Sequence, residues 1–260
     1  MSKYQLKEIL SIALDMGERM LKCGAEVSRV EKTISIICES YGVKYMEVFA
    51  MNSLIITTLR DNNDSVSESR RITYHENDLG QLERLNDLSR KICKKNVSRK
   101  VVLSKINECK KEKNNKKIII GQIIAASSFT LFFGGNIKDF FASLFISIII
   151  FFVNLYGNKN KINNLIINFL NSFVIGVISI LLVKINVGSN FDKIIIGNIM
   201  LLIPGLSMFI SINDIFKGDV LSGIGRFTEG IFLALTIAAG VGLSLLMLGG
   251  TLWLNYYGQC

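Results

Sequence analysis

The pattern of hydrophobic and polar positions divides the chain into an amphipathic first part and an apolar second part. In residues 6–22 and 25–41, apolar side chains recur at helical spacing and charged side chains occupy the other face. Gly24 and Gly42 follow these segments as helix-ending residues. The pattern therefore predicts a helical hairpin at the start of the chain.

Beyond the hairpin the pattern changes to β-branched and aromatic positions, which are typical of strands. Asn77 is a candidate N-cap for the helix that follows, and Ser98 begins a basic helix. Residues 1–117 are thus predicted to form an N-terminal α+β cytosolic domain in the order ααβββαα. The three expected antiparallel strands are residues 43–50, 54–60 and 66–73.

The second part contains long stretches without a charged residue. A bilayer core of about 30 Å needs about 20 apolar residues in a helix, because no water is present to pair an exposed backbone. Residues 118–260 are therefore predicted to form an all-α bundle of five transmembrane helices. These are residues 118–135, 140–156, 165–183, 194–212 and 230–248.

Lysines and arginines favour one side of these spans, and such residues remain in the cytoplasm. We expect a multi-pass protein of the cell (plasma) membrane with a cytoplasmic N terminus and an outer C terminus. Trp253, Tyr256 and Tyr257 would then lie at the outer interface. The positive residues on the inner side are Lys105, Lys110, Lys111, Lys113, Lys116, Lys117, Lys159, Lys161, Lys217 and Arg226, and those on the outer side are Lys138, Lys184 and Lys193.

The net charge of +9 would raise nucleic-acid binding for a soluble chain. Here the lipid bilayer explains it better, because anionic headgroups attract positive residues near span ends, and no nucleic-acid partner is expected. The five cysteines form no CxxC pair, and His75 is the one histidine. We therefore predict no metal site and no cofactor.

The chain's one proline, Pro204, lies in the predicted fourth span and is followed by Gly205. A mid-helix proline cannot donate to the preceding turn and clashes with it, so the helix should kink or break. Transporters use broken helices to hold substrates near the midplane. We expect Pro204 and Gly205 to line a substrate pathway with Asn168, Asn171 and Asn198; polar contacts between helices and a packing kink are the alternatives.

The last two spans carry further candidates. Asp214, Arg226 and Glu229 lie in a charged connection and are candidates for gating or coupling, whereas a solvated loop is the alternative. The fifth span repeats small residues that would let another helix approach closely. This predicted packing face consists of Gly230, Ala234, Ala238 and Gly242.

Two passages resemble the threonine/serine exporter family, in particular its longer component with a soluble N-terminal domain and five transmembrane helices. In the first passage, residues 24–31, the soluble-domain motif comprises Gly24, Arg29 and Glu31. The second passage, residues 203–242, reads Ile203-Pro204-Gly205-Leu206, Asn213-Asp214, Gly218-Asp219 and Ser222-Gly223 before a helix rich in Gly and Ala.

The resemblance implies export of small amino acids of the threonine/serine type, or of a small organic acid. Because fused members of the family have ten helices, it also implies a half-transporter that needs a second, shorter membrane subunit or a homo-oligomer. The competing hypothesis is a membrane-anchored cytosolic ligand sensor or scaffold. An enzyme built on Glu26, Arg29, Glu31 or His75 is not expected, because neither a nucleophile motif nor a phosphate-binding loop accompanies them.

Overall fold

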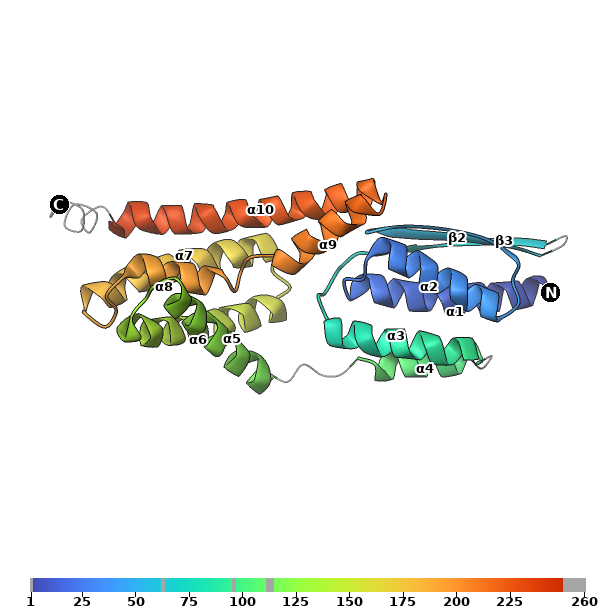
Figure 1. The fold of residues 1–260 in the computed structure, drawn as a ribbon, viewed down its shortest axis with the longest axis horizontal. Coiled ribbons are helices and arrows are strands. Elements are labelled where there is room, and N and C mark those ends of the chain that lie inside the picture. Colours follow the sequence, from blue (N-terminus) through green and yellow to red (C-terminus); the bar gives the residue numbers. More distant parts are fainter. Residues whose placement is uncertain (1, 62–63, 95–96, 111–114, 250–260) are drawn as a thin grey trace. The chain divides into compact units, whose positions relative to one another are not determined.

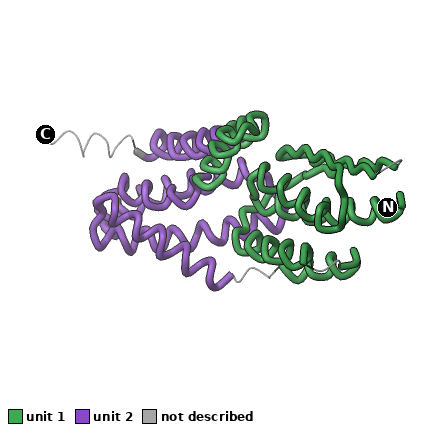
Figure 2. The backbone as a smooth tube through the Cα atoms, turned by 45° about the vertical axis from the view of Figure 1, so that its right-hand side comes forward, with its two compact units in different colours: residues 1–112, 205–228 green, residues 113–204, 229–260 purple. Residues whose placement is uncertain are grey.

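The structure is a computed structural model that describes residues 2–61, 64–94, 97–110 and 115–249 (Figure 1). Trp253, Tyr256 and Tyr257 lie outside the described residues. The chain is mostly helical and divides into two compact units (Figure 2). Unit 1 comprises residues 1–112 and 205–228, and unit 2 comprises residues 113–204 and 229–260. The predicted domain boundary at 117/118 stays a prediction. Residues 205–228 group with the N-terminal part.

In unit 1 the elements follow the predicted order ααβββαα. The sheet is antiparallel with strand order β1-β2-β3, and Tyr45 pairs with Arg60 while Asp61 pairs with Asp64. Helices α1 and α2 cover one face of the sheet, and α3 and α4 pack against these helices (Figure 1). The elements are α1 (Lys3–Lys22), α2 (Val27–Ser40), β1 (Tyr45–Met51), β2 (Leu54–Asp61), β3 (Asp64–Arg71), α3 (Leu79–Lys94) and α4 (Arg99–Glu108).

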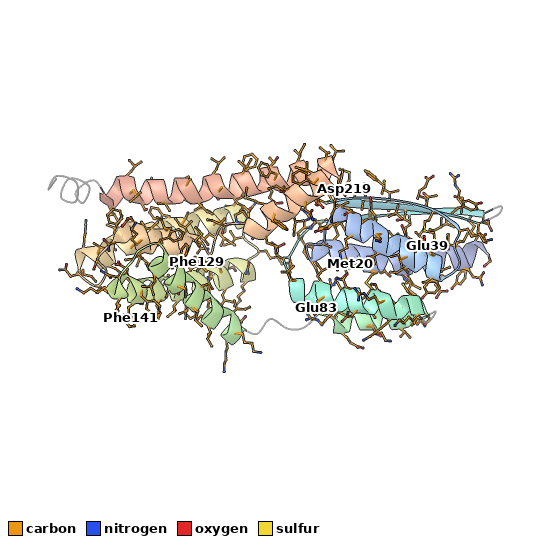
Figure 3. The ribbon with its side chains drawn as sticks, viewed as in Figure 1. Met20, Glu39, Glu83, Phe129, Phe141 and Asp219 are labelled. Carbon is orange, nitrogen blue, oxygen red and sulfur yellow. The ribbon has the colours of Figure 1, made fainter. Side chains whose placement is uncertain are left out.

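Helix α1 forms the centre of the unit 1 core. Leu10 and Met20 of α1 are fully buried together with Ile34 of α2, Ile55 of β2 and Leu85 of α3. Figure 3 labels Met20 on α1. Each large apolar side chain contributes roughly 1.5–3 kcal/mol when it is fully buried. The apolar stripes that predicted the hairpin are therefore the faces that hold the sheet and the outer helices together.

The predicted N-cap of α3 is wrong by one residue. The carboxylate of Asp78, rather than Asn77, accepts the hydrogen bond of the Gln81 backbone amide at 2.8 Å. The Asn77 side chain instead donates to Ser207 Oγ at 3.0 Å. Both residue types cap helices well, so the choice between neighbours depended on tertiary contacts.

The predicted solvated loop after the fourth span is largely helical. Helix α9 (Gly205–Phe216) and helix α10 (Val220–Ser244) leave only a short turn between them. Helix α10 thus begins ten residues before the predicted fifth span, and Arg226 and Glu229 both lie on it. Helical spacing alone could not find this extension, because polar and charged residues interrupt the apolar run.

Unit 2 contains the remaining helices, with a core of isoleucines such as Ile146, Ile175 and Ile194. A buried carboxylate, Asp139, accepts hydrogen bonds from backbone amides of Asn136, Ser189 and Asn190. It thereby fixes the start of α6 to the segment before α8. The elements are α5 (Asn115–Phe132), α6 (Ile137–Lys159), α7 (Asn164–Lys184), α8 (Phe191–Ile199) and the π-helix η1 (Leu245–Gly249), which follows α10.

Among the described residues, three helices are long and apolar enough to cross a membrane: Ile137–Lys159, Asn164–Lys184 and Val220–Leu248. Helix α5 is not one of them, and its first turn carries two lysines. The expected fourth span is interrupted as predicted, because α8 ends at Ile199 and α9 begins after Pro204. These pieces are about 14 and 18 Å long, so each alone is shorter than a bilayer core, and five spans stay a prediction.

Gly240 makes a close contact of α10 with α7. A Cβ atom on Gly240 would lie 2.6 Å from the Phe169 carbonyl oxygen and 3.0 Å from the Phe173 nitrogen. A Cβ atom on Gly242 would meet open space. Gly240 therefore packs α10 against α7. The predicted packing face, which includes Gly242, stays a prediction of contacts with another molecule.

Replacing these two glycines tests the α7–α10 contact. Gly240→Ala is expected to lower the free energy of unfolding by about 1–3 kcal/mol, because backbone atoms must move to admit the methyl group. Gly242→Ala is the matched control and should stabilise by up to about 1 kcal/mol through helix propensity. Thermal unfolding of the full chain in detergent measures both variants. Equal stabilities would contradict the observed packing.

Candidate functional site

Two helix-ending glycine turns shape a polar part of unit 1. Gly24 ends α1 with φ +87°, and the Ala25 amide donates to the Met20 carbonyl at 3.1 Å. Gly218 ends α9 with φ +96°, and the Asp219 amide donates to the Asp214 carbonyl at 2.9 Å. A side chain is strained at such positive φ values, so glycine is required in both Schellman-type turns. The two turns come from the two passages that carry the family resemblance.

Asp214 and Asp219, at the end of α9 and in the turn after it, cap the start of α2. The Val27 amide donates to Asp214 Oδ1 at 3.2 Å, and the Ser28 amide donates to the Asp219 carboxylate. The side chain of the N-cap residue Glu26 makes no capping hydrogen bond. The first amides of a helix have no partner within it, and the positive end of the helix dipole favours anions. We call this site the α2 junction and define it by Ala25, Glu26, Val27, Ser28, Asp214, Lys217, Asp219 and Arg226.

A buried ion pair lies at the centre of the α2 junction. Asp214 is fully buried, and Arg226 is only 8% exposed. Arg226 Nη1 lies 3.5 Å from Asp214 Oδ2, and Nη2 donates to the Ala25 carbonyl at 3.0 Å. Each partner therefore depends on the other to offset its desolvation. Beside this pair, burial raises the pKa of Asp219, which lies in the turn between α9 and α10.

A second, more exposed pair closes the junction. Glu26 binds the Lys217 ammonium group and accepts a hydrogen bond from Asn213 Nδ2 at 2.6 Å. Burial opposes ionisation of Glu26, but the hydrogen bond and charge of Lys217, with help from Asn213, lower its pKa below the ordinary value. Nearby, Asn52 Nδ2 donates to the Ser222 carbonyl at 2.8 Å. The start of α10 is thus also held by the β1–β2 turn.

The predicted soluble-domain motif divides into separate structural roles. Gly24 makes the turn before α2, and Glu31 Oε1 accepts the Ala50 amide at 2.7 Å, which ties α2 to β1. Arg29 is exposed on α2. Glu26 forms an ion pair with Lys217, which is distant in sequence. No structural feature assigns acid–base catalysis to these residues.

The gate candidates are brought together only in part. Asp214 and Arg226 meet in the α2 junction, whereas Glu229 is exposed on α10 in unit 2. Asp219 and Lys217 were not among the site residues predicted from the sequence. Asp219 does occur in the second family-like passage, so pairing that passage with the first would have singled it out.

The substrate-pathway candidates lie in unit 2 except for Gly205. Asn171 is buried on α7 and donates to Asn154 Oδ1 at 2.7 Å, while its own Oδ1 has no partner. Asn198 is buried on α8 and donates to Ser143 Oγ at 3.0 Å, and its Oδ1 is likewise unpaired. Asn168 and Pro204 are half-buried, and Gly205 is exposed. The two buried asparagines therefore have separate partners, and their role stays a prediction.

Two hydroxyl groups share this property with the asparagines. Within the described part of unit 2, Ser127 Oγ on α5 and Ser179 Oγ on α7 are also buried without a hydrogen-bond partner. An unpaired buried polar atom costs about 1–3 kcal/mol, so water or a ligand generally pairs it. We call these side chains the buried polar set: Ser127, Asn171, Ser179 and Asn198.

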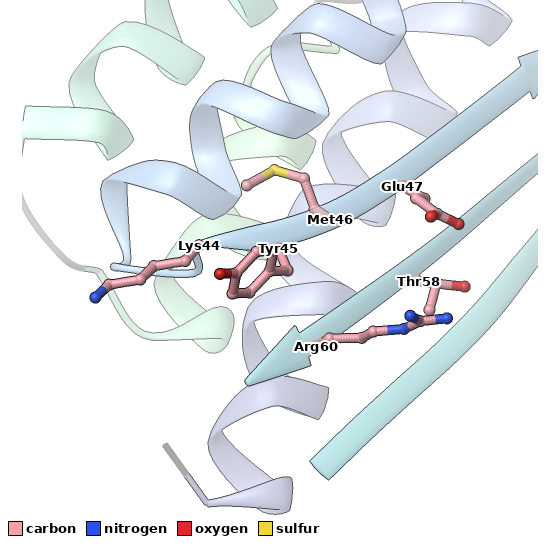
Figure 4. Close-up of a pocket in the computed structure, with 6 residues that line it drawn as sticks. All are labelled: Lys44, Tyr45, Met46, Glu47, Thr58 and Arg60. Atoms are coloured by element: carbon pink, nitrogen blue, oxygen red, sulfur yellow. The ribbon is translucent and has the colours of Figure 1, made fainter. Parts of the chain in front are cut away.

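A pocket of about 430 Å³ lies on the outer face of the sheet (Figure 4). Its lining includes Lys44 and Arg60 as well as Glu47, so both signs of charge are present. Tyr45 stands open to solvent at its edge. This mixture does not select a class of ligand. Among the described residues, no group of three or more His, Cys, Asp or Glu side chains could hold a metal ion.

Apolar helices of membrane-spanning length that enclose amide and hydroxyl groups are typical of multi-pass membrane transport proteins. The comparison with protein families agrees with this class. Residues 11–248 match the family ThrE, described as "Putative threonine/serine exporter", and the chain belongs to this family. Comparisons with curated proteins and with solved structures gave no match. The family is one of transporters rather than enzymes, and the resemblance of the two passages is confirmed.

The buried ion pair predicts a large effect of a single substitution. Asp214→Ala is expected to lower the free energy of unfolding by about 3–5 kcal/mol, because it leaves the Arg226 guanidinium buried without its partner. Adding Arg226→Met should recover part of the loss, since the unpaired charge is then removed. Urea unfolding followed by circular dichroism measures both, with the exposed Asp87→Ala as control. A double variant as unstable as the single one would contradict this account.

The Glu26–Lys217 pair predicts a pH dependence. The pKa of Glu26 is lowered from 4.5 in the folded state, so its stabilisation is present above that pH and is lost as the pH falls through the folded pKa. Glu26→Gln should therefore destabilise the chain at neutral pH and have progressively less effect in acid. Unfolding of both forms across this range measures the difference, and exposed Glu83→Gln is the control. A penalty that stays constant with pH would refute the assignment.

Proposed function

We propose that the protein exports small hydroxylated amino acids of the threonine/serine type across the cell membrane. Membership of the exporter family supports the class of protein and of substrate. The observation that carries a substrate site is the buried polar set in unit 2, whose amide oxygens and hydroxyl groups lack partners. A transport pathway needs such groups, because it must replace the water that a polar solute leaves behind.

The chemistry of the buried polar set fits a substrate of this kind. Unpaired amide oxygens of Asn171 and Asn198 accept hydrogen bonds, which suits an ammonium or hydroxyl group. The hydroxyl groups of Ser127 and Ser179 can donate to a carboxylate or accept from a hydroxyl. A site that pairs with a substrate hydroxyl rejects an analogue that lacks it, because the protein groups then stay buried and unpaired.

The membrane arrangement is part of the same proposal. Five spans would include α8, the break at Pro204 and α9 as one interrupted crossing, with the N terminus in the cytoplasm and the C terminus outside. The charged turn between α9 and α10 would then lie on the cytoplasmic side, which is consistent with its place in unit 1 beside the N-terminal domain. Five spans make half of a ten-helix transporter. A second, shorter membrane subunit or a homo-oligomer would complete it, with Gly230, Ala234, Ala238 and Gly242 as the contact face.

The α2 junction would couple the N-terminal domain to the membrane helices. Asp214 lies on α9, which directly follows Pro204, and Arg226 lies on α10, which continues into the predicted fifth span. A change in this ion pair would therefore reach both helices through the chain itself. Glu229, farther along α10, remains a candidate for the coupling step.

Efflux of labelled threonine and serine tests the proposed function. In the native cell, with any partner subunit still present, deleting the chain should abolish export. Restoring the chain should recover it. Asn198→Ala should reduce efflux by about tenfold, the effect of one lost hydrogen bond of about 1.4 kcal/mol. Asn164→Ala, at an exposed position on α7, is the control and should export normally. Wild-type efflux of both amino acids without the chain would reject the function.

A further inference from the structure

A basic groove runs between α2 and α3 in unit 1. It has a volume of about 630 Å³, which is within the usual range of small-molecule sites. Four of its lining side chains are cationic and none is a carboxylate. The lining residues are Arg29, Lys32, Thr33 and Ile36 from α2, and Asn86, Ser89, Arg90, Cys93 and Lys94 from α3.

The spacing of these residues shows that two helix faces form the groove. On α2 the lining residues follow one another at intervals of three, one and three positions. On α3 the same spacing recurs from Asn86 to Cys93, and Lys94 follows directly. Residues three and four apart lie on one side of a helix. The four cations are therefore gathered on facing helix sides rather than scattered over the surface.

Carboxylates are present on both helices, but none of them lines the groove. Glu39 on α2 and Glu83 on α3 are exposed and do not line the groove (Figure 3). Like charges brought together repel, and an anion bound between them removes this repulsion. Arginine forks bind phosphate with two parallel hydrogen bonds, and lysine adds a mobile point charge. The groove thus has the charge and the donors for a phosphate group.

The remaining lining groups indicate what the phosphate is attached to. Ile36 is 43% exposed and Cys93 is half-buried, which leaves an apolar patch beside the cations. Thr33, Asn86 and Ser89 add neutral hydrogen-bonding groups. An apolar patch next to a cationic cluster suits a ligand with a phosphate and an organic body.

We propose that the α2–α3 groove binds an organic phosphate, as a ligand site separate from the substrate pathway. Arg29 and Arg90 hold the phosphate, Lys32 and Lys94 neutralise its remaining charge, and Ile36 contacts the organic part. Arg29 follows directly after Ser28 of the α2 junction, so the ligand contacts the helix that Asp214 and Asp219 cap. The phosphate belongs either to a soluble metabolite or to a lipid headgroup, since the same chemistry recognises both.

Cys93 provides a direct reporter of occupancy. Burial raises the pKa of Cys23 to about 11 and that of Cys38 to about 12, so both thiols react slowly. In a Cys109→Ser/Cys260→Ser background of the full chain, maleimide labelling then reports on Cys93. The chain is placed in nanodiscs of phosphatidylcholine at low salt, and labelling is followed with increasing ADP or pyrophosphate. A second set of nanodiscs contains phosphatidylglycerol and no soluble phosphate.

The expected result is slower labelling of Cys93 with ADP or pyrophosphate, or with phosphatidylglycerol if the source is a lipid. Arg29→Gln/Arg90→Gln should weaken this protection by about tenfold or more, because two charge-assisted contacts are lost. Lys44→Gln/Arg60→Gln removes the same charge from the outer sheet face of Figure 4 and should leave protection intact. Labelling unaffected by every phosphate source, or protection that survives the groove variant, would overturn the proposal; circular dichroism verifies that each variant is folded.

Discussion

The first amides of α2 need hydrogen-bond partners that their own helix cannot provide. The Val27 amide finds its partner in Asp214, which lies 187 residues farther along the chain. This requirement ties the N-terminal α+β fold to the α9–α10 turn. It explains why residues 205–228 belong to unit 1 although apolar helices surround them in sequence. The buried Arg226 follows from the same constraint, because a buried Asp214 carboxylate needs a cation nearby.

Unit 2 is organised around a different constraint, namely that polar groups inside an apolar bundle must be paired or must serve a ligand. Asp139 is fully occupied by backbone and side-chain donors, so its role is structural. Asn171 and Asn198 each retain an unpaired oxygen, which is why they carry the proposed substrate site. A buried polar group whose hydrogen bonds are all made is thus structural. A buried polar group that keeps an unpaired atom is a candidate for binding a ligand.

The proposals assign three kinds of chemistry to three places in the chain. The buried polar set recognises a small zwitterion, the α2 junction links the N-terminal domain to two helices that continue toward the membrane, and the basic groove recognises phosphate. Helix α2 takes part in the last two, because its first turn carries the capped amides and its next turns line the groove. A ligand in the groove would thus act on the element that the junction holds.

Sequence patterns determined the local elements of this protein. Helical periodicity and runs of β-branched and aromatic residues predicted the order ααβββαα, the proline predicted the interruption between α8 and α9, and two passages showed the resemblance to the family. These features follow from residue spacing and backbone geometry, which act over a few positions. Tertiary structure decided that Asn77 contacts Ser207, that Gly240 meets α7, and that Asp214 and Asp219 cap α2. Such contacts join residues distant in sequence, and no local periodicity specifies which donor will meet which acceptor.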